Sequence, residues 1–144
     1  MNKEIFLKKA EDSFDKTVYE PEGLFFYHFF DFQFDYDDIL RTCKVTCSVK
    51  EPMWNSFQMV HGGFLSYIAD TALGHLNLHF YEGTFVTLEM KTSFLKGIKT
   101  GEITAISRFV KEGRKVLFSE CEIFNGNNEK LCITSGTFYR KDQR

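Results

Sequence analysis

The chain has 144 residues, a length that fits one domain and leaves little room for a second. Hydrophobic residues make up 43% and charged residues 26%, close to the average of globular domains, which argues against a disordered chain. Eighteen Lys and Arg against twenty Asp and Glu give a net charge of -2, which argues against binding to a nucleic-acid backbone.

The sequence shows neither a membrane span nor a signal peptide. Its longest uncharged apolar stretches, such as residues 24–30, fall far short of the ~20 residues that a membrane span needs. The N-terminal residues MNKEIFLKKAED carry charges every few positions and lack the apolar core of a signal peptide. We therefore expect a cytoplasmic protein whose partners include neither nucleic acid nor membrane.

The first region of the chain, residues 3–14, places Ile5, Phe6, Ala10 and Phe14 among charged side chains, which predicts a weakly amphipathic helix. A proline at position 21 and a glycine at position 23 end this region.

Two strands are predicted next. Residues 25–36 alternate aromatic with polar side chains, and residues 41–49 alternate small apolar with polar ones. A period of two with polar partners predicts strands with one buried face. Four cysteines stand at positions 43, 47, 121 and 132, without the spacing of a zinc site. We expect all four to be reduced, buried and unreactive.

The period changes to 3.6 over residues 64–79, which predicts a long helix. One side of this helix is apolar and consists of Phe64, Leu65, Ile68, Ala69, Ala72, Leu73 and Leu76. The Gly62–Gly63 pair permits a sharp turn into the helix, and Gly83 is predicted to close it.

Four further alternating runs predict strands over residues 85–95, 102–111, 115–125 and 131–140. Their glycine- and asparagine-rich connections are hairpin signals, and consecutive hairpins build an antiparallel sheet. A single long helix against such a sheet is typical of an α+β domain.

The Gly62–Gly63 amides are predicted to lie at the start of the long helix, where N–H groups lack partners and the helix dipole favours negative charge. Such a terminus can stabilise a developing oxyanion. The alternative interpretation is that this pair only makes a tight turn.

Asp70 falls on the side of the helix opposite the apolar arc, together with Ser66, Gly74 and Asn77. In a monomer it would be a solvated carboxylate. If a second subunit covers this face, the carboxylate is partly desolvated and suits a general base or a nucleophile.

These residues carry a resemblance to a known family. The pattern H-G-G-x-L-x-x-x-x-D-x-A-L-G begins at His61, and Asn55 precedes it by six residues. The pattern, with the segments at 87–95, 101–102 and 110–115, resembles the hotdog-fold acyl-CoA thioesterases of the phenylacetate-pathway (PaaI-like) type. The resemblance spans roughly residues 30–140.

The resemblance implies a single hotdog domain over residues 1–144, in which residues 1–23 form an N-terminal helix and its connection. It implies a curved antiparallel sheet wrapped around one helix, and homodimers with joined sheets that often form homotetramers. It also implies two composite sites per dimer.

The resemblance further implies the roles of the site residues. Asp70 would activate water or attack the thioester carbonyl, and Thr87 of the same subunit would orient the water. The Gly62 amide and the Asn55 side chain of the other subunit would polarise the carbonyl. His61 would shape the turn.

The remaining predicted substrate-binding residues include Gly63 and Tyr67 near the reacting centre. Lys96, Lys111 and Arg114 would meet the phosphates of coenzyme A, although a solvated charged rim is the alternative. His75 and His79 have the spacing of a metal pair, but neither a following Glu nor a third ligand is evident. We therefore expect no metal and no cofactor besides the coenzyme A of the substrate.

The sequence thus predicts a thioester hydrolase that acts on an aromatic or medium-chain acyl-CoA. The alternative is a non-catalytic hotdog protein that binds acyl-CoA or regulates a partner, and a hotdog dehydratase ranks third. The sequence leaves open the acyl group, the choice between dimer and tetramer, and whether Asp70 acts as base or nucleophile. It also leaves open whether the aromatic block at 24–36 lines an acyl pocket or packs as ordinary core.

Overall fold

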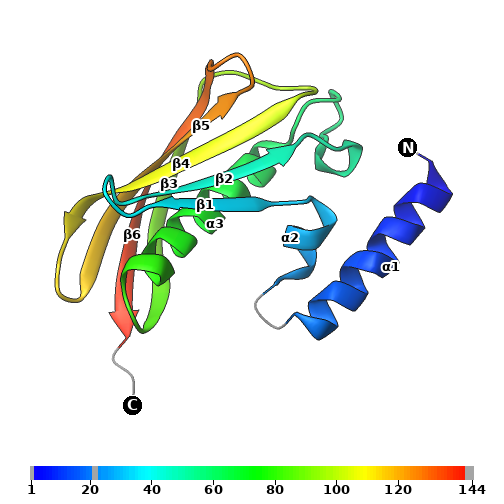
Figure 1. Cartoon of the computed structure of the whole chain (residues 1–144). Helices are drawn as coiled ribbons and strands as arrows, with labels where there is room; N and C mark the ends of the chain where they lie inside the picture. The colour runs from blue at the N-terminus through cyan, green and yellow to red at the C-terminus, as the bar shows by residue number, and fades with distance from the viewer. Residues whose placement is uncertain (1, 21–22, 142–144) are drawn as a thin grey trace.

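A computed structural model describes residues 2–20 and 23–141 of the chain. The helices are α1 (Lys3–Tyr19), α2 (Phe25–Phe29), the 3-10 turn η1 (Glu51–Met53) and α3 (Gly62–Phe80). The strands are β1 (Gln33–Asp37), β2 (Thr42–Ser48), β3 (Thr84–Phe94), β4 (Glu102–Glu112), β5 (Val116–Asn125) and β6 (Lys130–Lys141). The sheet curves along α3, while α1 and α2 lie beyond the β1 end (Figure 1).

The six strands form one antiparallel sheet in the order β1-β2-β4-β5-β6-β3. The hairpins β4–β5 and β5–β6 are confirmed. The predicted hairpin between β3 and β4 is wrong, because β3 pairs with β6 along its length and becomes an edge strand. The connection after β3 instead passes the segment before α3, where Val60 N–H donates to the Ile98 carbonyl over 2.9 Å and Ile98 is buried.

The long helix α3 carries the core, as its periodicity predicted. Its buried apolar residues are Leu65, Ile68, Ala69, Ala72, Leu73 and Leu76, which pack against the concave face of the sheet. The buried Ser107 hydroxyl ties the helix to the sheet, since it lies 2.9 Å from the Ala72 carbonyl and 3.2 Å from the Cys43 carbonyl. One prediction for α3 is wrong: Asn77 is fully buried, not on the exposed face.

The four cysteines are free and buried, as predicted. Burial raises the pKa of the Cys43 and Cys47 thiols to about 12 and that of Cys132 to about 11. Burial also raises the pKa of Cys121. The thiolate is the reactive form of cysteine, so these thiols are unreactive at neutral pH.

The aromatic block is where sequence and structure differ most. Residues 25–36 were expected to form one strand, but α2 occupies the first part and β1 only the last. The run FFYHFF at 25–30 has no alternating polar partner, so a helix can bury it on several sides. Phe30 stacks edge-on against Phe64 of α3 at 4.6 Å between ring centroids, and Asp31 turns the chain with φ of 53°.

The C-terminal ends of α1 and α3 differ from the predicted ends. Helix α1 continues to Tyr19, past the predicted end at residue 14, and α3 ends at Phe80 with Tyr81 as its C-cap. Gly83 therefore lies beyond the helix, where its φ of 119° makes the turn into β3. Within the described parts of the chain, no helix is long and apolar enough to cross a membrane.

Gly136→Ala tests the close packing of β6 on α3. A Cβ at this position would lie 2.8 Å from Phe138 Cε2 and 3.1 Å from Leu73 Cδ1, and both side chains are buried. Overpacking of this kind costs about 1–3 kcal/mol, and we expect the free energy of unfolding in urea to fall by that amount. Gly126→Ala is the control, because its new Cβ meets nothing closer than 4.0 Å. Equal stability of the two variants would contradict the packing described.

Candidate active site

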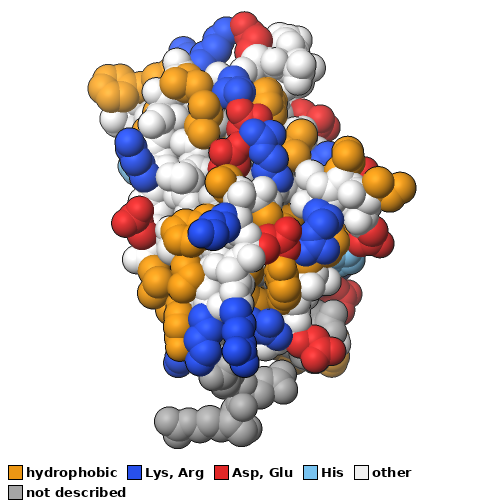
Figure 2. Space-filling view, turned by 90° about the vertical axis from the view of Figure 1, so that its left-hand side faces the viewer, with side chains coloured by type: hydrophobic (Ala, Val, Ile, Leu, Met, Phe, Trp, Pro, Cys, Tyr) orange, Lys and Arg blue, Asp and Glu red, His pale blue; other side chains and the backbone are white. Residues whose placement is uncertain are grey.

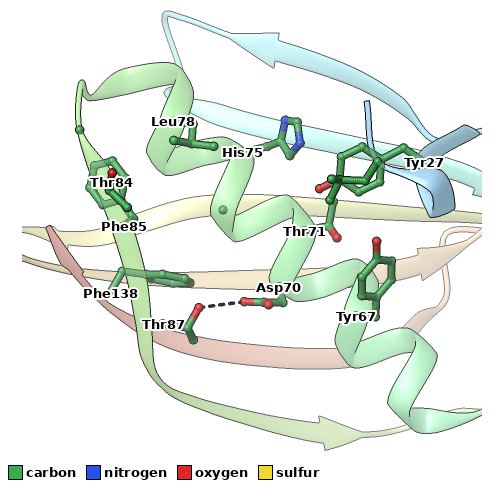
Figure 3. A pocket seen from close by; sticks show the side chains of 13 residues that line it. Tyr27, Tyr67, Asp70, Thr71, His75, Leu78, Thr84, Phe85, Thr87 and Phe138 are labelled. Carbon is green, nitrogen blue, oxygen red and sulfur yellow. Dashed lines mark hydrogen bonds between the residues drawn. The ribbon is translucent and has the colours of Figure 1, made fainter. Parts of the chain in front are cut away.

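A groove of about 440 Å³ runs along the side of α3 that the sheet leaves uncovered. Its floor is a stripe of α3 that includes Tyr67, Asp70, Thr71 and Gly74, residues spaced three or four apart and therefore on one helix face. The beginning of β3 forms one wall, and Tyr27 of α2 closes the other end (Figure 3).

Asp70 and Thr87 meet in this groove. The Thr87 hydroxyl donates to Asp70 Oδ1 over 3.2 Å, and both side chains are exposed (Figure 3). Thr87 stands where the pairing of β3 with β6 shifts register, between Thr87 and Glu89. A β-bulge changes the direction of side chains, and here it accompanies a hydroxyl aimed at a carboxylate on a helix.

The N-terminus of α3 forms a second group of predicted site residues. His61 is the N-cap of the helix, and its Nδ1 accepts the Gly63 N–H over 2.9 Å. Among the described residues we find no acceptor for the Gly62 N–H. An N–H that is unpaired at a helix N-terminus is free to stabilise negative charge.

Asn55 holds the loop that leads into this terminus. Its Oδ1 accepts the N–H of Phe57 over 2.9 Å and that of Met59 over 3.3 Å. The carbonyl end of the side chain is thus committed to the loop. The amide NH₂ end is the part of Asn55 that can donate to a substrate carbonyl.

Within one chain the two groups lie apart. Asp70 follows Gly62 by eight residues on the same helix, a separation of about 12 Å along the axis. The structure therefore brings Asp70, Thr87 and Tyr67 together in the groove, and it brings Asn55, His61, Gly62 and Gly63 together at the helix terminus.

The three cationic side chains that were predicted to bind phosphate lie in two separate places. Lys96 follows the end of β3 and pairs with Glu129 at 2.5 Å. Lys111 and Arg114 lie at the β4–β5 hairpin, beside the C-terminal end of β6, where Arg140 N–H donates to the Lys115 carbonyl over 2.8 Å. Several basic side chains lie close together near the lower end of the space-filling view (Figure 2).

The groove residues that sequence reasoning did not assign to the site include Tyr27, Thr71 and His75. Thr71 follows Tyr67 by four residues and His75 follows Thr71 by four, and this helical spacing is the signal that points to both, whereas nothing local in the sequence places Tyr27 there. Burial raises the pKa of Tyr27, and burial raises that of Tyr67 to about 12, so both phenols stay neutral.

The two helix histidines have partners other than a metal. Burial lowers the pKa of His75, whose Nδ1 lies 2.8 Å from the Tyr36 hydroxyl, and its ring stacks on Phe34 at 4.0 Å. His79 Nε2 lies 2.7 Å from an Asp38 oxygen. Among the residues that the structure describes, there is no cluster of three metal-ligand side chains.

A curved antiparallel sheet wrapped around one long helix is the architecture of a hotdog-fold protein. Residues 57–132 match the model of the thioesterase superfamily. The chain is also 30% identical over 131 residues to a candidate esterase of Sulfurisphaera tokodaii. This match covers 90% of this chain and 96% of that protein. The chain therefore belongs to the thioesterase superfamily, a family of thioester hydrolases.

Solved structures share the fold. The PaaI protein of E. coli, from the phenylacetic acid degradation operon, superposes with a TM-score of 0.77 at 20% identity and covers 93% of this chain and 96% of its own. The BH2602 protein of Bacillus halodurans, solved with CoA, has a TM-score of 0.86 at 19% identity and covers 100% of this chain and 97% of its own. These similarities confirm the predicted hotdog fold.

Proposed function

We propose that the protein hydrolyses the thioester of an aromatic or medium-chain acyl-CoA at sites shared by two copies of the chain. The observation that carries this proposal is the Asp70–Thr87 pair, which lies in an open groove on the uncovered side of α3. The relative solved with CoA supports coenzyme A as part of the substrate.

The chemistry follows from the donors and acceptors of the two groups. The Thr87 hydroxyl donates a hydrogen bond to Asp70, and the lone pairs of its oxygen remain available to accept a hydrogen bond from a water molecule. Asp70 removes a proton from this water, whose oxygen attacks the thioester carbonyl carbon. The C–S bond then breaks, the acid is released, and the coenzyme A thiolate takes up the proton. Direct attack by the carboxylate, followed by hydrolysis of the anhydride, is the other route open to Asp70.

The oxyanion that forms on the carbonyl oxygen needs donors. The unpaired Gly62 N–H at the start of α3 supplies one, and the Asn55 amide supplies another. Because Gly62 lies about 12 Å along the helix from Asp70, the donors would come from a second chain.

The edge strand β3 supports a homodimer. It is eleven residues long, pairs with β6 alone among the described residues, and exposes Val86 at 40% and Leu88 at 60%. Long apolar edges of this kind tend to pair with another chain. Pairing β3 with its copy would join two sheets, and a homotetramer would need a further interface.

Coenzyme A carries phosphates that require cations. Lys111 and Arg114 at the β4–β5 hairpin, and Lys96 near the opposite end of the sheet, are the cations we assign to them. In a two-chain assembly each site could draw on cations from both copies.

Asp70→Asn tests the proposed base. The variant keeps the size of the side chain but removes its charge, so we expect kcat for thiol release to fall by about 10²–10⁴-fold. The exposed Asp70 has its hydrogen bond with Thr87 and is not part of the core, so the thermal midpoint should change little. Asp12→Asn, on an exposed position of α1, is the control. Turnover at the parent rate in Asp70→Asn would remove Asp70 from the mechanism.

Gly62→Pro tests the oxyanion donor. Proline lacks the N–H but suits the first position of a helix, and the extended His61 backbone is compatible with a following proline. Loss of one such donor lowers kcat by about 10²–10³-fold. Gly62→Ala is the matched control, because it retains the N–H and places its Cβ 3.0 Å from the same Phe94 ring. If both variants lose activity equally, the donor role is wrong and the effect is steric.

A further inference from the structure

A second cavity, of about 480 Å³, lies between the N-terminal helices and the first turns of α3. Helix α1 contributes Phe6 and Ala10, and α3 contributes Gly63, Phe64 and Tyr67. The remaining wall consists of four phenylalanines, from positions 25, 26, 29 and 30, and Pro52.

The walls of this cavity are held by packed aromatic rings. Phe6 meets Phe29 edge-on at 5.3 Å between centroids, and Phe26 meets Tyr67 edge-on at 5.8 Å. Phe29 and Phe30 are buried. Ring pairs in these arrangements are favourable beyond their buried area, so the cavity has a defined shape.

The chemistry of the lining is suited to hydrocarbon. No residue that lines the cavity in the described chain carries a charge, and the Tyr67 phenol is its one polar side-chain group. By contrast, the groove beside Asp70 includes the hydroxyls of Tyr27, Thr71 and Thr87 (Figure 3). Those groups match water and the polar arm of coenzyme A better than an alkyl or aryl group.

The position of the cavity links it to the reacting centre. Gly63 lines it, and the neighbouring Gly62 N–H is the proposed partner of the thioester carbonyl oxygen. Tyr67 lines both this cavity and the groove, so the two spaces adjoin at one side chain. A carbonyl held at Gly62 therefore has hydrocarbon-lined space on one side.

The far end of the cavity has a boundary. Phe6, Phe29 and Pro52 separate it from a neighbouring cavity of about 370 Å³. The lining of that neighbouring space includes Lys9 and Lys50, which both pair with Asp31. A hydrocarbon chain would stop at Phe6 and Phe29, since passage beyond them leads to charged groups.

We infer that this cavity of α1, α2 and α3 receives the hydrocarbon part of the acyl group, and that α1 sets how long that group can be. The inference rests on the proposed function. It assigns the acyl pocket to the chain that supplies Gly62, while the other chain supplies Asp70 and Thr87.

Two substitutions on α1 test this inference because they change the cavity in opposite directions. Ala10→Leu fills part of the cavity, and Phe6→Ala enlarges it by the space of the removed ring. The probes are straight-chain acyl-CoAs of increasing length, together with benzoyl-CoA and phenylacetyl-CoA, and the readout is kcat/KM for thiol release. Each methylene that the cavity holds should be worth about fourfold in kcat/KM.

We expect Ala10→Leu to move the preferred acyl length to shorter chains and Phe6→Ala to move it to longer ones. The aryl esters show whether a ring fills the same space, since Ala10→Leu should then lower their kcat/KM as well. Leu7→Ala is the control, because Leu7 lies on the same helix, is 53% exposed and does not line the cavity. Unchanged length profiles in both test variants would overturn the inference.

Binding separates this inference from the proposed function. Calorimetry with the same esters on Asp70→Asn, alone and combined with each α1 substitution, measures recognition without relying on turnover. If the wild type releases no thiol from any ester, the proposed function fails. The α1 substitutions must still change how Kd depends on acyl-chain length. If this dependence is the same with and without both substitutions, the pocket assignment is wrong.

Discussion

The central constraint in this structure is that one sheet covers only part of one helix. The apolar arc of α3 requires a curved sheet to bury it, and the six strands satisfy that requirement along their concave face. The opposite side of α3 then has no cover from its own sheet. Asp70 lies on that side, next to the edge strand β3, which pairs with β6 alone among the strands that the structure describes. Packing the core and exposing the groove are therefore two results of the same arrangement.

The same helix presents two chemically different features. Its N-terminus offers a backbone donor at Gly62, with His61 holding the adjacent Gly63 amide, and its uncovered side offers a carboxylate with a hydroxyl at hand. Thioester hydrolysis needs both a donor and a base close to one carbonyl group. Since a rigid helix keeps them about 12 Å apart, the site that we propose unites them by pairing two chains through β3.

Much of the fold was predictable because local periodicity reports burial. The 3.6-residue period of α3 and the alternation in β2 and in β3 to β6 correspond to observed elements. The pairing of β3 with β6 was not predictable from local signals. Glycines in a connection do not tell whether the two strands that it joins are neighbours in the sheet or lie apart. Helix α2 was missed because a continuous aromatic run has no period, and its rings are buried by contacts with distant residues such as Phe64.

For the site, the resemblance named Asp70 and Thr87, and the structure places them in hydrogen-bond contact. It could not reveal Tyr27 or the aromatic cavity, since both depend on how the N-terminal helices pack against α3. Both helices lie outside the sheet, so the strand pattern carries no information on where they pack (Figure 1).

The activity of a mixed dimer is the most direct test of the shared site. A chain with Asp70→Asn and a chain with Gly62→Pro are co-expressed with different affinity tags and purified through both. One of the two sites then carries both substitutions, while the other combines an intact Asp70 with an intact Gly62. The account predicts about half of the wild-type activity per dimer, although each variant alone is nearly inactive. A mixed dimer as inactive as its two parents would show that no site is shared and would contradict the account.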